Sequence, residues 1–212
     1  MHSFWQAFTS LGDSGFLLPA GLLIALWLFL DKGSRTSALH WALAFGACGL
    51  IVMLSKLAFM GWGIGSARLD FTGFSGHTAL ATSVWPVLLW MATPQMTRRG
   101  RLVAAGLGWC VAVSIGISRL ALEVHSNSEV IAGAVLGSTA SAGFLWWHSR
   151  PISPPGPHQG RRWSLVAVVM LLAVVSHGRP APTQGALELI AARLANREQP
   201  FTRNEMLATF PG

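Results

Sequence analysis

Six apolar stretches dominate the sequence and restrict the folds that it can adopt. They cover residues 16–30, 39–59, 78–93, 102–122, 130–147 and 163–176. A helix needs about 20 apolar residues, within a range of about 17 to 25, to cross the hydrocarbon core of a bilayer. The second, fourth and fifth stretches reach that length, and the other three reach it with flanking residues. The pattern predicts an all-α integral membrane protein, a bundle of six transmembrane helices.

The composition also favours lipid as the surrounding solvent. Hydrophobic residues make up 52% of the 212 residues and charged residues 11%, whereas a soluble domain usually carries about 25% charged residues. Cys48 and Cys110 lie inside apolar stretches, so the sequence predicts neither a disulfide framework nor a zinc site. Residues 1–15 contain no Lys or Arg, so the first stretch is not expected to be a cleaved signal peptide.

The basic residues predict the orientation in the membrane. Eight of the fifteen lie in the connections 31–38, 94–101 and 148–162, which share one side of the membrane if the six segments alternate. By the positive-inside rule that side is cytoplasmic. Both termini and the opposite connections then face the periplasm or exterior of a bacterial inner membrane. Because topology accounts for the net charge of +7, we expect membrane lipids and no nucleic acid as partners.

We assign residues 1–176 to one membrane domain and residues 177–212 to a C-terminal tail. Segment 149–162 contains four prolines and two glycines, which is typical of a turn-rich connector rather than a second domain. In the tail, apolar residues between positions 187 and 194 alternate with charged ones. This predicts an amphipathic helix on the outer membrane interface or a loosely ordered segment.

Two polar clusters interrupt the apolar pattern at the ends of predicted spans. The first is Phe74-Ser75-Gly76-His77, just before the third apolar stretch. The second begins with Ser118-Arg119 and continues with His125 and Glu129, between the fourth and fifth stretches. Ionisable groups at such positions are costly and therefore indicate function. Alternation of the spans brings both clusters to one membrane face.

The first cluster has the properties of an anion site. Ser75-Gly76 directly precedes a predicted helix, whose first backbone N–H groups and partial positive charge favour a phosphate. The alternative is structural, with Ser75 or Thr78 as the helix cap and His77 as an interfacial histidine.

The second cluster combines a cation with a candidate nucleophile. The Arg119 guanidinium matches phosphate oxygens, and neutral His125 can attack phosphorus if a carboxylate holds its other ring nitrogen. Glu129 lies four residues later, within reach over one helical turn. Segment 126–129 also matches a helix capping box, a structural role that does not exclude the first.

Lys56 and Arg68 reach the same face at and after the end of the second span. Lys56 is either a phosphate ligand or a lysine that snorkels from the end of its span. Arg68 can pair locally with Asp70. The glycines at positions 61, 63 and 65 have no preceding strand and no following Gly-Lys-Ser, so they do not predict a nucleotide-binding loop.

The order and spacing of these clusters resemble the type 2 phosphatidic acid phosphatase superfamily, whose membrane members have six spans. Its motifs are Lys-x6-Arg-Pro, Pro-Ser-Gly-His and Ser-Arg-x5-His-x3-Asp. The second appears here with Phe74 in place of Pro, and the third as Ser118-Arg119-x5-His125-x3-Glu129, with Glu in place of Asp. The first matches least, because eleven residues separate Lys56 from Arg68 and no Pro follows.

The resemblance covers about residues 50–145 and implies a role for each matched residue. His125 would be the nucleophile that forms a phosphohistidine, Glu129 would orient it, and His77 would be the general acid on the leaving oxygen. The phosphate ligands would be Arg119, Arg68, Lys56, Ser118, and the backbone of Ser75 and Gly76. Because fixed cations can neutralise phosphoryl oxygens, we predict no metal and no cofactor.

We therefore predict a membrane phosphatase that hydrolyses a lipid phosphate or diphosphate at the outer face. The substrate would be a polyprenyl diphosphate, phosphatidic acid, phosphatidylglycerol phosphate or a lipopolysaccharide phosphate. A lipid phosphotransferase that passes the group to an alcohol is one alternative, and a non-enzymatic transporter or scaffold is another. A transport pathway would place ionisable groups through the membrane depth, whereas here they gather at one face.

Overall fold

The computed structural model describes residues 2–31, 33–148, 168–169 and 182–208. The regular secondary structure within these residues is helical, apart from one isolated bridge between Ser66 and Phe71. The elements are α1 (His2–Thr9), η1 (Ser10–Gly12), α2 (Ser14–Leu30), α3 (Arg35–Trp62), η2 (Ala67–Leu69), α4 (Gly76–Ala92), α5 (Arg98–Ala121), α6 (Asn127–His148), α8 (Thr183–Leu194) and α9 (Arg203–Ala208).

Five of the six predicted apolar helices are present as α2 to α6, which confirms the all-helical prediction for the described chain. The sixth stretch, residues 163–176, lies outside the described residues except for Val168 and Val169, which are helical. Four helical segments are long and apolar enough to cross a membrane: Phe4–Leu30, α3, α5 and α6. Helix α4 has 17 residues. A membrane protein is therefore supported, and the count of six spans stays a prediction.

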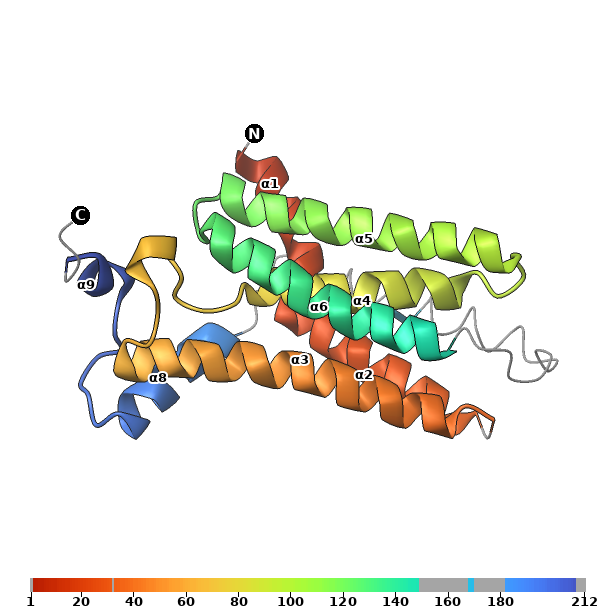
Figure 1. Ribbon diagram of the computed structural model, residues 1–212, viewed down its shortest axis with the longest axis horizontal. Coiled ribbons are helices and arrows are strands. Elements are labelled where there is room, and N and C mark those ends of the chain that lie inside the picture. Colours follow the sequence, from red (N-terminus) through yellow and green to blue (C-terminus); the bar gives the residue numbers. More distant parts are fainter. Residues whose placement is uncertain (1, 32, 149–167, 170–181, 209–212) are drawn as a thin grey trace.

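Helix α4 occupies the centre of the bundle, enclosed by α2, α3, α5 and α6 (Figure 1). Twelve of its 17 residues are buried, so it has no single apolar face. The hydroxyls along it bond to nearby carbonyls; that of Thr82, for example, donates to the Thr78 carbonyl at 2.8 Å. An all-round buried helix of this kind carries polar groups only where such partners are available.

Small residues on α6 allow it to lie directly against the α4 backbone. A Cβ atom added at Gly137 would lie 2.0 Å from the Ala79 carbonyl oxygen, and one at Gly133 would lie 2.7 Å from the Ser75 carbonyl oxygen. One turn further, the Ser141 hydroxyl donates to the Thr82 carbonyl at 2.8 Å. This small-residue stripe is typical of close helix contacts in membranes.

Helix α5 approaches the other side of α4 in the same way. A Cβ atom at Gly108 would lie 2.6 Å from the Trp85 carbonyl oxygen, and Ala112 is fully buried between the helices. Large apolar side chains instead cover the outside of the bundle, as in Leu22 (69% exposed), Val103 (64%) and Ile131 (63%). Such an apolar exterior suits contact with lipid chains.

The chain ends and the polar clusters gather at one end of the bundle (left in Figure 1). This end contains the connection 63–75 between α3 and α4, the turn 122–126 between α5 and α6, and helices α8 and α9. The turns between α2 and α3 and between α4 and α5 lie at the opposite end. The arrangement agrees with the alternation from which the sequence placed both clusters on one face.

The C-terminal tail is built onto the end of α3. Ala191 of α8 and Met206 of α9 are buried against Phe59 and Met60, and the Phe201 backbone N–H donates to the Met60 carbonyl at 2.7 Å. The helix predicted in the tail is therefore present as α8. Its position on a membrane interface stays a prediction.

Candidate active site

His125 and Glu129 form a short hydrogen-bonded pair at the start of α6. His125 Nδ1 lies 2.6 Å from Glu129 Oε2, and the Glu129 side chain is completely buried while 14% of the His125 side chain is exposed. Burial lowers the pKa of His125 below its ordinary value, although the bond to Glu129 and the charge of Glu129 act to raise it. The ring is therefore held in one orientation, with Nε2 as the remaining nitrogen.

The second carboxylate oxygen of Glu129 accepts three further hydrogen bonds. Its donors are the Thr72 backbone N–H at 2.8 Å, the Thr72 hydroxyl, and the Arg203 guanidinium at 2.7 Å. The same guanidinium bonds to Asp70 at 2.8 Å through its other terminal nitrogen. The local Arg68–Asp70 pair that the sequence suggested is therefore replaced by a pair between Asp70 and the C-terminal tail.

Glu129 also belongs to the capping box that the sequence predicted. The Ser126 backbone N–H donates to Glu129 Oε2 at 3.2 Å, and the Glu129 N–H donates to the Ser126 hydroxyl at 3.4 Å. One side chain thus makes both sets of contacts expected of Glu129, the bond to His125 and the helix cap. The start of α6 fixes the carboxylate, and the carboxylate fixes the imidazole.

His77 lies at the second position of α4, opposite a carboxylate from the N-terminal segment. Its Nε2 atom is 3.7 Å from Asp13 Oδ2, and the side chains are 24% and 13% exposed. Asp13 caps α2 by accepting a hydrogen bond from the Gly15 N–H at 2.7 Å. Its charge also acts on Arg119. Asp13 therefore links the start of α2 to two of the predicted site residues.

Four cationic or titratable side chains converge around this point. Lys56, His77, Arg119 and His125 lie near enough for their charges to interact in every pairwise combination. Arg119 donates to the Thr9 hydroxyl at 3.1 Å, and its buried Nε atom has no hydrogen-bond partner within the described chain. Lys56 donates to the Gln184 side chain at 2.8 Å. Such a group of cations with spare donors is suited to a multiply charged anion.

The N-terminus of α4 contributes backbone donors, although not all those expected. The Ser75 N–H is already occupied, because it donates to the Glu129 carbonyl at 3.1 Å. Within the described residues the N–H groups of Gly76, His77 and Thr78 have no hydrogen-bond partner. These three groups, rather than that of Ser75, are the ones left for an anion at this helix end.

Within the described residues, no hydrogen bond or ion pair joins the side chains of Ser75, Ser118 or Arg68 to the four converging groups, and their role as phosphate ligands stays a prediction. The Ser75 and Ser118 side chains are fully buried and bond to the Thr78 hydroxyl at 2.9 Å and the Ile115 carbonyl at 2.6 Å. Both serines therefore have structural roles, since their hydroxyls are taken up within the helices. Arg68 is exposed, on the short helix η2, and no hydrogen bond or ion pair joins it to another described residue.

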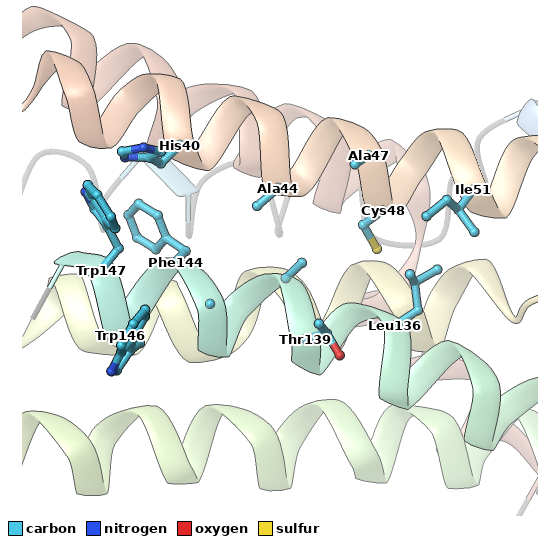
Figure 2. A pocket seen from close by; sticks show the side chains of 12 residues that line it. His40, Ala44, Ala47, Cys48, Ile51, Leu136, Thr139, Phe144, Trp146 and Trp147 are labelled. Atoms are coloured by element: carbon cyan, nitrogen blue, oxygen red, sulfur yellow. The ribbon is translucent and has the colours of Figure 1, made fainter.

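An apolar cleft runs between α3 and α6 (Figure 2). Its volume is about 500 Å³, and small or apolar side chains form most of its walls. Ile51 and Leu136 line the part nearer the polar end, while His40 and Trp147, whose ring centroids are 4.4 Å apart, line the far part. The cleft follows the same two helices that carry Lys56 and Glu129.

No group of three or more His, Cys, Asp and Glu side chains with the proximity of metal ligands occurs in the part of the chain that the structure describes.

Comparison with known proteins decides the family. The model of the PAP2 superfamily, the type 2 phosphatidic acid phosphatases, matches residues 19–153. The chain belongs to the PAP2 superfamily. The resemblance found in the two polar clusters is thereby confirmed. The PAP2 match contains both clusters, whereas Asp13 and the whole C-terminal tail lie outside it.

Two curated proteins are similar to the chain. An "Uncharacterized 22.5 kDa protein in cps region" from Klebsiella pneumoniae is 43% identical over 204 residues, which is 95% of this chain and 97% of that protein. A "Phosphatidylglycerophosphatase B" from Bacillus subtilis (strain 168) is 31% identical over 141 residues, which is 61% of this chain and 66% of that protein. No solved structure matches the chain.

Three residues of the site were missed at the level of sequence: Asp13, Thr72 and Arg203. Asp13 and Thr72 lie outside every motif, and their contacts with the clusters span tens of residues. Arg203 had one usable signal, because Thr202-Arg203-Asn204-Glu205 matches a capping box. The structure forms that box, with the Thr202 N–H donating to Glu205 at 2.6 Å and the Glu205 N–H donating to the Thr202 hydroxyl at 3.3 Å.

Proposed function

We propose that the protein is a membrane phosphatase that hydrolyses a lipid phosphate or diphosphate through a phosphohistidine intermediate. The observation that carries the proposal is the His125–Glu129 pair, 2.6 Å apart and surrounded by Arg119, Lys56 and His77. PAP2 membership supports lipid phosphate hydrolysis at the level of the family. The residue roles below are inferred from the contacts of each side chain.

In the first step, His125 Nε2 attacks phosphorus while Glu129 holds the Nδ1 proton. The N–P bond forms as the bond between phosphorus and the leaving lipid oxygen breaks, and His77 donates a proton to that oxygen. Glu129 stabilises the positive charge that develops on the imidazole. Asp13 Oδ2, 3.7 Å from His77 Nε2, places a carboxylate beside this proposed general acid.

In the second step, water attacks phosphorus and the N–P bond breaks, releasing inorganic phosphate and neutral His125. His77 now accepts the proton of the water molecule. In both steps Arg119, Lys56 and the free N–H groups at the α4 N-terminus neutralise the phosphoryl oxygens. Since phosphoryl transfer depends mainly on positioning and charge neutralisation, these fixed donors can supply the required electrostatics.

The apolar chain of the substrate is expected to occupy the cleft between α3 and α6. Ile51, in the cleft, is five residues before Lys56 on the same helix, and Leu136 is seven residues after Glu129. A lipid with its phosphate at the polar end would therefore have its chain alongside these walls. The relative named as a phosphatidylglycerophosphatase agrees with a phospholipid headgroup, and prenyl diphosphates have the same combination of chain and charge.

Filling the cleft should reduce activity only on long chains. Gly143 lines it 14 residues beyond Glu129, about 21 Å along α6, and a Cβ there would contact nothing within 4 Å. For Gly143→Trp we expect kcat/KM to fall about tenfold for a substrate with sixteen-carbon chains. It should change less than about twofold for eight-carbon chains, which are too short to reach Gly143. Equal losses on both substrates would contradict this placement of the chain.

We infer that the site faces the periplasm or the exterior of an inner membrane, with both termini on that side. The inference rests on Arg35, Arg98, Arg99 and Arg101, which begin α3 and α5 at the opposite end of the bundle. A fluorescent reporter that matures only in the cytoplasm should stay dark when fused after Gly212. Fluorescence from a full-length fusion protein would place the C-terminus in the cytoplasm and contradict this orientation.

The function is tested with purified protein in detergent and a panel of lipid phosphates and diphosphates. We expect release of inorganic phosphate that persists with EDTA. Added lipid alcohol separates hydrolysis from phosphotransfer, because a phosphotransferase would convert the alcohol to its phosphate at the expense of free phosphate. No phosphate release and no transfer on any member of the panel would overturn the proposal.

A further inference from the structure

The C-terminal tail places a cation on the carboxylate of the proposed active site. Arg203, the first residue of α9, is 74 positions from Glu129 in the sequence, yet its guanidinium lies 2.7 Å from Glu129 Oε1. Its other terminal nitrogen lies 2.8 Å from Asp70 Oδ2. Arg203 therefore joins three segments of the chain: the tail, the connection before α4 and the start of α6.

Glu129 requires such a partner because it is buried. Its side chain is 0% exposed, and a carboxylate removed from water is stable only when its oxygens are bonded to donors or cations. One oxygen serves His125 and the Ser126 N–H, and the other serves Thr72 and Arg203. Arg203 is thus the permanently charged donor in this set. It acts on the carboxylate oxygen opposite the one that holds His125.

The tail around Arg203 is held firmly enough to define its position. Met206, on the next turn of α9, is 5% exposed and packs with Phe59 and Met60. The ring of Phe201 packs edge-on against Phe59 with centroids 5.6 Å apart. The capping box of Thr202 and Glu205 begins α9 directly before the arginine. These contacts hold the backbone of Arg203 in one position, so that its side chain reaches Glu129 and Asp70 from a defined place.

We propose that Arg203 is a positioning residue of the active site, which holds Glu129 so that Glu129 in turn holds His125 for attack. The proposal rests on the proposed function for its effect on turnover. Because the match to the PAP2 superfamily ends at residue 153, Arg203 lies outside the region that the chain shares with that family. The tail is therefore part of the catalytic unit of this protein.

The proposal is tested by measuring kcat and KM of full-length Arg203 variants, with a variant of another arginine in the tail as the control. For Arg203→Met we expect kcat to fall about tenfold or more, as for loss of a charge-assisted bond to a buried carboxylate, with KM changed less than about twofold. Arg203→Lys keeps the charge but cannot bond to Glu129 and Asp70 with two fixed nitrogens. Its kcat should lie between those of Arg203→Met and the wild type. Arg197 also lies in the tail but pairs with Glu205 at 3.2 Å, so Arg197→Met should behave as wild type.

The pKa of His125 provides a second measurement, which should not change if the tail has a purely structural role. Attack requires neutral His125, whose pKa lies below its ordinary value of 6.5 in the folded protein, so wild-type activity should persist below pH 6.5. Removing the Arg203 charge leaves the Glu129 charge to act more strongly on the imidazolium. The pKa of His125, and with it the acid limb of the activity profile, should rise by about half a unit or more in Arg203→Met.

A nuclear magnetic resonance titration of isotope-labelled histidines measures this shift without substrate. It therefore decides the role of Arg203 even if the wild-type protein releases no phosphate, an outcome that would overturn only the proposed function. An unchanged kcat and an unchanged His125 titration in Arg203→Met would overturn the positioning role. Equal losses in Arg203→Met and Arg197→Met, with no shift in the His125 titration, would also overturn it by showing only a general need for a folded tail.

Discussion

Replacing His125 with alanine should reduce phosphate release by about 10⁴-fold or more. The imidazole is the proposed nucleophile, and its Nδ1 atom lies 2.6 Å from the buried Glu129 carboxylate. Losses of this size are typical when a nucleophile that forms a covalent intermediate is removed. The measurement is initial-rate phosphate release in detergent, together with recovery of the acid-quenched phosphoenzyme from radiolabelled substrate. Neither activity nor phosphoenzyme should be detected in His125→Ala.

His148→Ala is the matched control for this experiment. His148 is the last residue of α6, at the far end of the helix from His125, and its Nδ1 atom is 3.1 Å from the Ser37 hydroxyl. It should retain both turnover and phosphoenzyme. In His77→Ala, by contrast, turnover should fall because the leaving oxygen is no longer protonated. Full activity of His125→Ala would refute the phosphohistidine route, whatever the behaviour of the other variants.

Replacing Gly137 with valine should prevent normal folding of the bundle. A Cβ atom at this position would lie 2.0 Å from the Ala79 carbonyl oxygen and 2.2 Å from the Thr82 hydroxyl, so α6 would have to move away from α4. Overpacking against backbone atoms is rarely relieved by rotamer changes, and we expect a loss of about 3 kcal/mol or more. Thermal melting in detergent, followed by size-exclusion chromatography, should show a much lower Tm or aggregation.

Gly46→Val separates this contact from the general cost of valine in a helix. Gly46 lies on α3, and a Cβ atom there would have no neighbour within 4 Å. Its Tm should stay close to that of the wild type. Because the Ser75 N–H bonds to the Glu129 carbonyl across the interface of α4 and α6, any Gly137→Val protein that folds should also lose activity. A Gly137→Val protein with wild-type Tm would contradict the close packing of these helices.

The helices and the central pair of the site could be predicted because both depend on local sequence. The length of each apolar stretch sets a helix, and α2 to α6 follow the predicted stretches closely. His125 and Glu129 are four residues apart at the start of α6, where the helix cap turns the carboxylate back towards the imidazole. The capping box from Ser126 to Glu129 depends on the same spacing.

The remainder of the site depends on contacts between distant segments, which spacing does not encode. Asp13, Thr72 and Arg203 approach the two clusters only after the bundle and the tail have packed. Ser75 was expected to offer its N–H to an anion, but the close approach of α6 through Gly133 places the Glu129 carbonyl in front of it. Likewise, Asp70 pairs with Arg203 instead of its neighbour Arg68 because the tail supplies a fixed guanidinium.

The enclosure of α4 by protein has a consequence for the way the molecule fits its membrane. At 17 residues α4 is about 25 Å long, shorter than a hydrocarbon core of about 30 Å. A lipid-exposed helix of that length would thin the bilayer or draw in flanking residues, but α4 touches helices rather than lipid and is free of this constraint. Its N-terminus, and His77 with it, can therefore lie beneath the headgroup level set by the longer outer helices. A lipid phosphate would then meet the histidines by sinking slightly into the protein, without its chain leaving the bilayer.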